Sequence, residues 1–267
     1  MAVRTINSRD WWHHMMDQTS DAPKVAFVIN LAQADSSSPN LARLRHLMHL
    51  FHGHRVAASW AVTNVSQARV LRDSSPGTSA ADFALMVDDN WGASDVSSSR
   101  FGNELGSRLV GLKNSVGAAP MLVVGDLGAL RSRMTLLADQ GVRAIISNDH
   151  SASDASSSRP LPCGLWQLVP SLHWPKRRLS RWLPSRSTSV KDLLAADTRG
   201  SILVNVEAAA LERVSARGLR SIEKLLREVS WSASRGQMQI SAVSEIVADL
   251  VSEREVKPQR SILRTAA

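Results

Sequence analysis

The sequence predicts an α/β fold: one domain in which about seven strands form a distorted (β/α) barrel. Short apolar runs alternate with segments of helical period along the chain. Continuous apolar runs are typical of parallel strands that are covered on both faces, and alternation of strand and helix is typical of parallel α/β folds. So many runs favour a barrel over an open sheet. We expect the barrel to span residues 21–253, between a flexible segment 1–20 and a flexible basic tail 254–267.

The predicted elements follow one another in a regular order. Strands are expected at residues 25–30, 55–63, 82–87, 120–124, 142–147, 165–169, 201–206 and 237–241. Helices are expected at residues 40–51, 66–73, 100–115, 128–140, 189–197, 210–233 and 242–253. Pro39 suits a first helical turn, and Gly53, Gly141 and Gly236 each end a helix directly before a strand.

The composition predicts a cytoplasmic protein without a membrane span. No run approaches the roughly 18 apolar residues of a span, and residues 1–23 carry charges where a secretion signal needs an apolar segment. Cys163 is the only cysteine, which excludes an internal disulfide and fits a reducing compartment. Trp11 and Trp12 are unusual in a flexible tail, and we expect them to dock on the barrel or on a second subunit of a homo-oligomer.

The net charge of +8 suggests that the chain could bind an anionic partner. Residues 175–186, PKRRLSRWLPSR, hold five cations and no acid. This segment is a candidate contact for phosphate, an anionic sugar or a lipid headgroup, and the alternative is a solvated basic loop. No zinc-finger spacing or other nucleic-acid signature is present, so nucleic acid is not an expected partner.

Three stretches of the chain resemble the NodB-type polysaccharide deacetylases. HGHRVAASWAVT, from residue 52, is similar to the family's second strand and the turn before it. DFALMVDDNWGASDVSSSRFGNELGSRL, from residue 82, resembles its third strand, metal loop and next helix. The stretch from GSILVNVEA to SEIVADL resembles the closing strands and helices, so the similarity covers about residues 24–252. It implies a distorted barrel of about seven βα units.

The resemblance also implies a chemistry from which this chain departs. Family members hold a divalent metal with one aspartate and two histidines, and use an aspartate as base and a late histidine as acid. Here Asn30 stands where the first aspartates belong, and MVDDNWGASD lacks the two histidines. VVGDLGA replaces the arginine–proline motif, and Asn205 occupies the late histidine position. We therefore expect no metal and no cofactor, with a divalent metal as the alternative.

Four of the eight histidines lie close together in HLMHLFHGH. His46, His49 and His52 step around a helix, while the apolar residues between them form the opposite stripe. His46 and His49 could share a metal, but the helix runs away from the end of the barrel that carries active sites. We expect a solvated helix face.

Carboxylates and histidines near the carboxyl ends of the strands are the candidate catalytic groups. These are Asp35, Asp88, Asp89, His150 and His173. The carboxylates could bind a hard cation such as Mg²⁺ or Ca²⁺, and either histidine could act as a lone acid or base. The alternative for the aspartates is a turn or a helix entry with solvated acids.

Candidate ligand-binding residues lie at the same end. They are Trp91, Trp166, Trp174 and Asn205. Exposed tryptophan faces suit stacking on sugar rings, whereas buried ones would pack under loops.

The sequence therefore predicts a deacetylase-like barrel without metal-dependent deacetylation, with a carbohydrate or a protein as its partner. Two alternatives remain. One is an active hydrolase with a rearranged site, and the other is a structural or oligomerisation module.

Overall fold

The computed structural model describes residues 22–31, 38–74, 82–117, 121–147, 158–174, 190, 201–208 and 216–256. The predictions made for residues 1–20, for Trp11 and Trp12, for the basic segment 175–186 and for the tail beyond residue 256 lie outside this part of the chain.

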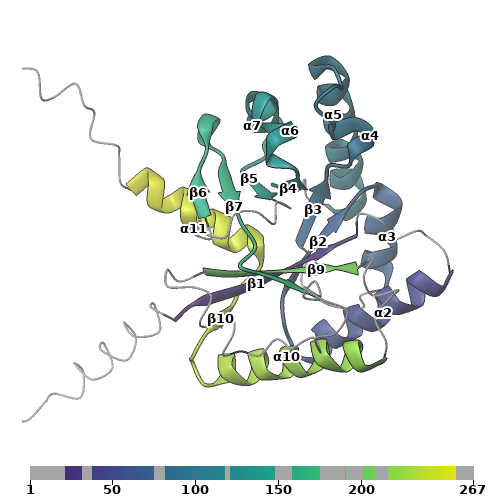
Figure 1. Ribbon diagram of the computed structural model, residues 1–267, viewed down its shortest axis with the longest axis vertical. Helices are drawn as coiled ribbons and strands as arrows, with labels where there is room; N and C mark the ends of the chain where they lie inside the picture. Colours follow the sequence, from purple (N-terminus) through teal and green to yellow (C-terminus); the bar gives the residue numbers. More distant parts are fainter. Residues whose placement is uncertain are drawn as a thin grey trace, which may run out of the picture.

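One curved sheet forms the centre of the molecule (Figure 1). Its strands are β1 (Lys24–Asn30), β2 (Ala58–Val62), β3 (Asp82–Met86), β4 (Leu122–Gly125), β5 (Ala144–Ser147), β6 (Ser158–Pro160), β7 (Trp166–Leu168), β8 (Leu172–Trp174), β9 (Ser201–Glu207) and β10 (Gln239–Ile240). They are hydrogen-bonded in the order β6-β7-β5-β4-β3-β2-β1-β9-β8, and β10 pairs with β1. All pairs are parallel except β6 with β7.

A single stretch of chain closes the ring. β7 pairs with β5 and β8 pairs with β9, at opposite ends of the strand order, yet only residues 169–171 separate β7 from β8. The segment Trp166–Trp174 therefore bridges both ends of the sheet, and Ser171 N–H of this segment donates to Leu203 O on β9 (2.8 Å). The ring consists of β1, β2, β3, β4, β5, the β7–β8 segment and β9, which confirms the predicted distorted barrel of about seven strands.

Helices cover the outside of the barrel and its amino-terminal end. They are α2 (Ser38–Gly53), α3 (Val65–Asp73), α4 (Asp89–Gly92), α5 (Ser98–Val116), α6 (Leu127–Leu130), α7 (Met134–Asp139), α10 (Ala216–Ser234) and α11 (Val243–Val256). The helix predicted at residues 128–140 is in fact divided into α6, the 3-10 turn η2 (Arg131–Arg133) and α7. The division occurs where the backbone of Arg133 leaves helical geometry (φ −118°, ψ 10°) and its side chain turns inward.

Two layers of apolar side chains hold the strands. Because side chains alternate across a strand, one set fills the barrel and the other lies under the helices. The outer set packs against α2, α3, α5, α7 and α10. The inner set is Ala26, Val28, Ala61, Ala84, Met86, Leu122, Val124, Ala144, Ile146, Leu168 and Leu203, together with Val243, Ile246 and Val247 of α11.

α11 closes the amino-terminal end of the barrel. Side chains of two strands cap the first turn of this helix. Its N-cap residue, Ala242, has no polar side chain, although Ala242 N–H donates to Glu245 (3.1 Å). Val243 N–H donates to Ser59 Oγ (3.0 Å), and Ser244 N–H donates to Asp82 Oδ2 (3.2 Å). Ser59 also donates a hydrogen bond to Asp82. Side chains from β2 and β3 thus satisfy free N–H groups that an N-cap residue usually satisfies.

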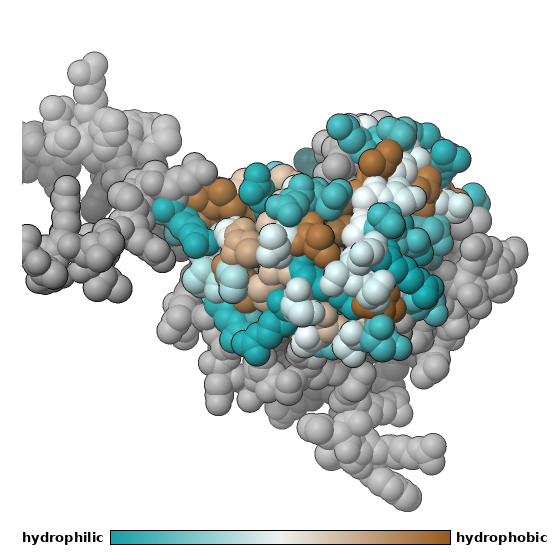
Figure 2. Space-filling view, turned by 90° about the horizontal axis from the view of Figure 1, so that it is seen from above, coloured by the Kyte–Doolittle hydropathy of each residue, from teal (hydrophilic) through white to brown (hydrophobic). Residues whose placement is uncertain are grey.

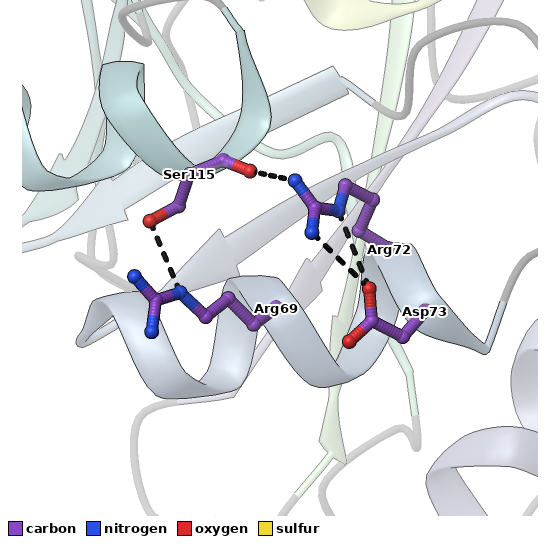
Figure 3. Close-up of polar contacts among 4 residues, drawn as sticks. All are labelled: Arg69, Arg72, Asp73 and Ser115. Atoms are coloured by element: carbon purple, nitrogen blue, oxygen red, sulfur yellow. Dashed lines mark hydrogen bonds and ion pairs between the residues drawn. The ribbon is translucent and has the colours of Figure 1, made fainter.

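On the opposite side of the sheet, α3 is tied to the end of α5 (Figure 3). Arg69 Nε donates to Ser115 Oγ (3.3 Å), and Arg72 donates to the backbone oxygen of Ser115 while pairing with Asp73 (3.3 Å). A guanidinium at the last carbonyls of a helix also meets the negative end of the helix dipole. These contacts fix the end of α5 relative to α3.

Figure 2 shows the molecule from above Figure 1. On this face the hydrophobic residues form small, separate areas between hydrophilic ones. Surfaces of this kind are normal for a folded domain.

Candidate functional site

The mouth of the barrel is the end at which the parallel strands finish, and β1, β8 and β9 carry polar residues on its inner wall. Asn30 ends β1, Asn205 and Glu207 lie on β9, and His173 lies on β8. Each is on the inner side because its strand neighbours pack in the outer core. The strand register places Asn30 beside Glu207 and His173 beside Asn205. The predicted site residues Asn205 and His173 are therefore brought together.

Asn205 and His173 form a direct pair. The amide nitrogen of Asn205 lies 3.2 Å from His173 Nδ1, and the side chain of Asn205 is buried, with 2% of its surface exposed. Asn205 Oδ1 is also buried and has no hydrogen-bond partner among the described residues. If the amide were turned over, its nitrogen would be the unpaired atom instead. In either orientation one buried polar atom of Asn205 has no hydrogen-bond partner among the described residues.

The aspartates that follow β3 and β4 serve as helix caps. Asp88 accepts a hydrogen bond from Asn90 N–H (3.0 Å) at the start of α4. Asp126 accepts from Gly128 N–H (2.9 Å) and Ala129 N–H (3.2 Å) at the start of α6. This arrangement matches the helix-entry alternative for Asp88, because its carboxylate already has a structural role. The side chain of Asp89 lies outside the described part.

The loop after β3, where the resemblance implies metal-binding histidines, is instead tightly packed. The ring of Trp91 stacks on Phe101 (5.3 Å between centroids), and the Arg108 guanidinium lies 5.0 Å from the ring centre of Trp91. Gly92 leaves no room for a side chain, since a Cβ there would lie 2.1 Å from Val87 Cγ1. This loop is therefore part of the core.

Arg133 holds the same loop from the other side. Its guanidinium donates to Gly92 O (2.8 Å), Ala93 O (2.7 Å) and Val96 O (2.6 Å), and it lies 4.5 Å from the ring centre of Phe101. Only 2% of Arg133 is exposed. Planar, charge-assisted donation to three carbonyl oxygens fixes the loop. Sequence analysis did not identify Arg133, because an arginine inside a helical period gives no sign that it is buried.

The predicted tryptophans differ in their exposure. Trp91 is 3% exposed and Trp174 is 4% exposed, and both belong to the outer core. Burial removes the free ring face that stacking on a sugar requires, which argues against the ligand-binding role predicted for these two. Trp166 is half-buried beside the inner core, and its Nε1 has no hydrogen-bond partner among the described residues.

The histidine-rich helix is oriented as predicted. On α2 the side chains of His46, His49 and His52 are exposed, while Leu47, Met48 and Phe51 are buried. The prediction of a solvated face is confirmed.

The remaining candidates do not add a metal site within the described part. Asp35 and His150 lie outside it. Among the residues that the structure describes, no group of three histidine, cysteine or carboxylate side chains could hold a metal ion. At the mouth, the described imidazole is bound to Asn205 and the carboxylates of Asp88 and Asp126 cap helices. This donor set does not fit the aspartate–histidine–histidine site that the resemblance implies.

None of the described helices is long and apolar enough to cross a bilayer.

Comparison with known proteins identifies the fold. No protein-family model matches the chain, and no curated protein sequence matches it significantly. Among solved structures, a protein described as a polysaccharide deacetylase from Mycobacterium smegmatis is similar over 89% of this chain and 93% of its own, with a TM-score of 0.60 and 13% identity. A protein described as a polysaccharide deacetylase from Pseudomonas aeruginosa PAO1 is similar over 88% of this chain and 93% of its own, with a TM-score of 0.56 and 10% identity. The Puue allantoinase is similar over 85% of this chain and 90% of its own, with a TM-score of 0.53 and 12% identity. The chain thus has the polysaccharide-deacetylase fold that the resemblance predicted.

Proposed function

We propose that this chain binds a carbohydrate at the mouth of a deacetylase-type barrel and does not carry out metal-dependent deacetylation. The fold supports a carbohydrate ligand by analogy only, because one fold can carry many functions. The residues at the mouth support both the choice of ligand and the loss of this chemistry.

The observation that carries the proposal is the Asn205–His173 pair. Amide side chains offer both a donor and an acceptor, which suits the hydroxyl and acetamido groups of a sugar. A buried amide oxygen without a partner is costly, so a ligand that donates to it gains the full benefit of that hydrogen bond. Neither asparagine nor a single engaged imidazole can hold a transition metal against an acetamide in the way that two histidines and an aspartate can.

The loop after β3 supports the same proposal. In a metal-dependent barrel this loop would present ligands toward the mouth, whereas here it buries Trp91 and is held by Arg133. A loop packed in this way provides a fixed wall for binding but no imidazole for catalysis.

Glycan-array screening followed by titration of the best-binding sugar tests the proposal. We expect Asn205→Ala to weaken binding about tenfold, the effect of one lost buried hydrogen bond. The matched control is Asn103→Ala, because Asn103 is exposed on α5, and it should bind normally. Circular dichroism spectra of both variants would establish that they are folded.

The catalytic part of the proposal has its own test. Purified protein should release no acetate from acetylated chitooligosaccharides above the buffer rate, with or without added Zn²⁺, Co²⁺ or Ni²⁺. Metal-dependent release that is lost in His173→Ala would instead establish a rearranged active site. Absence of sugar binding, or equal binding by Asn205→Ala and wild type, would overturn the carbohydrate assignment.

A further inference from the structure

We propose that the outer face of α10 docks on an anionic lipid bilayer. This face, called the α10 face below, consists of Arg220, Lys224, Arg227, Trp231 and Arg235. It lies on the outside of the barrel and is independent of the mouth, so this proposal goes beyond the proposed function.

Helical spacing places these side chains in one row. Positions 220, 224, 227 and 231 are separated by four, three and four residues, so they lie on one side of α10 and extend over about 16 Å. All four are exposed, as is Arg235 just beyond the helix. On the opposite side, Ile222, Leu225, Leu226 and Val229 are buried against the barrel. The packing of α10 therefore leaves this row of side chains exposed.

Acidic residues only partly balance the row. Glu223 is exposed at one flank. Glu228 lies 3.8 Å from Lys224 Nζ and also accepts a hydrogen bond from Val190 N–H (3.3 Å). The α10 face holds four cations against these two acids. A net positive surface of this kind is complementary to anionic headgroups.

Trp231 favours a bilayer over a soluble polyanion. Its side chain is 57% exposed, and the Arg235 guanidinium lies 4.5 Å from the ring centre. An exposed tryptophan beside cations is typical of membrane-interface contacts, where the ring lies at headgroup depth and arginine binds phosphate. A guanidinium over the ring occupies a face that a sugar or a base would need for stacking. Together these features fit a lipid surface better than a polysaccharide or a nucleic acid.

The position of α10 suits contact with a flat surface. In Figure 1 the helix lies along the lower edge of the described part of the molecule, with the sheet on its other side. The whole length of the row could therefore reach a bilayer at once.

Vesicle binding by the full chain tests the proposal. Co-sedimentation would compare phosphatidylcholine vesicles with vesicles that contain phosphatidylglycerol, at low and high salt. Each basic residue near an anionic surface contributes about 1 kcal/mol, so a net charge of two predicts about 30-fold stronger binding to anionic vesicles. We expect the triple variant Arg220→Gln, Lys224→Gln, Arg227→Gln to lose about tenfold or more of this binding at low salt.

A matched control separates the α10 face from the net charge of the whole chain. Arg100→Gln, Lys113→Gln and Arg131→Gln remove the same charge from exposed positions on other elements and should change binding less than about twofold. Brominated lipids should quench fluorescence in the wild type and markedly less in Trp231→Phe. Asn205→Ala should bind vesicles normally, which keeps this proposal distinct from sugar binding at the mouth.

Several outcomes would overturn the inference. One is equal loss of vesicle binding in the α10 and control triple variants. A second is tighter binding of polygalacturonate or single-stranded RNA than of anionic vesicles. A third is no preference for anionic vesicles at all.

Discussion

Replacing Arg133 by methionine should destabilise the whole domain. The substitution removes three short hydrogen bonds from the loop after β3 and leaves the Gly92 oxygen without its donor in a buried position. An unsatisfied buried carbonyl costs about 1–3 kcal/mol, and loss of the cation–π contact with Phe101 adds about 0.5–2 kcal/mol. The Ala93 and Val96 oxygens are only partly buried, so water can replace the guanidinium there.

One effect acts in the opposite direction, because removing the guanidinium also removes the cost of burying a charge. The net expectation is a free energy of unfolding about 2–4 kcal/mol lower than that of the wild type. Urea unfolding followed by circular dichroism measures this difference, and the midpoint should fall while the slope stays unchanged. Hydrogen exchange should also quicken at the Gly92 and Val96 amides, which bond within this loop.

Arg131→Met is the matched control. Arg131 lies two positions away and is exposed, so its loss should cost under about 0.5 kcal/mol. A similar loss of stability in both variants, or a loss under about 1 kcal/mol for Arg133→Met, would refute the argument that Arg133 holds the loop.

Three further predictions concern other parts of the barrel. Gly92→Ala should destabilise the protein by about 1–3 kcal/mol because its Cβ would collide with Val87, whereas Gly102→Ala in α5 has ordinary contacts and should be neutral or slightly stabilising; thermal unfolding of both variants decides this. Burial raises the pKa of the Asp82 carboxyl above its ordinary value of 3.8, against hydrogen bonds from Ser59 and Ser244 that lower it. The stabilising contribution of Asp82 is therefore complete below pH 3.8 and is lost as the pH rises through the raised pKa, so Asp82→Asn should gain stability relative to wild type as the pH rises above 3.8. Urea midpoints across this range measure the gain, and a constant difference would contradict it. Replacing His46, His49 and His52 together by glutamine should change the free energy of unfolding by under about 0.5 kcal/mol in a urea titration, because all three are exposed; a large loss would show that α2 depends on them.

The main strands and the outer helices could be predicted because burial leaves a local record in the sequence. The apolar runs at residues 25–30 and 201–206 correspond to β1 and β9, and the stripe of Leu47, Met48 and Phe51 identified the buried side of α2. Periodicity depends only on neighbouring residues, so one sequence suffices to detect it. Gly141 and Gly236 were predicted to end helices for the same reason, and both have the positive φ that this role requires.

Ring closure could not be predicted in the same way. β7 and β8 have three residues each, and β8 contains His173 between two apolar residues, so β8 gives no strong strand signal. Their pairing depends on which distant strands they meet.

The candidate site shows a similar division. The sequence placed Asn205 and His173 at the mouth, and predicted that residues other than histidine would occupy the loop after β3. It did not indicate that the Arg133 guanidinium would donate to carbonyl oxygens of the loop after β3. The partner Gly92 lies 41 positions earlier in the chain, beyond the reach of any local pattern.

What the sequence by itself determined is the class of fold and the kinds of side chain available at each strand end, because hydrophobic period and residue identity are local properties. Only the tertiary structure decided which polar groups have hydrogen-bond partners. Asp82 and Ser244 lie 162 positions apart, and the burial and hydrogen bonding of such a pair exist only once the chain has brought α11 against β3. A buried polar group is stable only with a partner, and the partner is chosen by packing rather than by sequence neighbourhood.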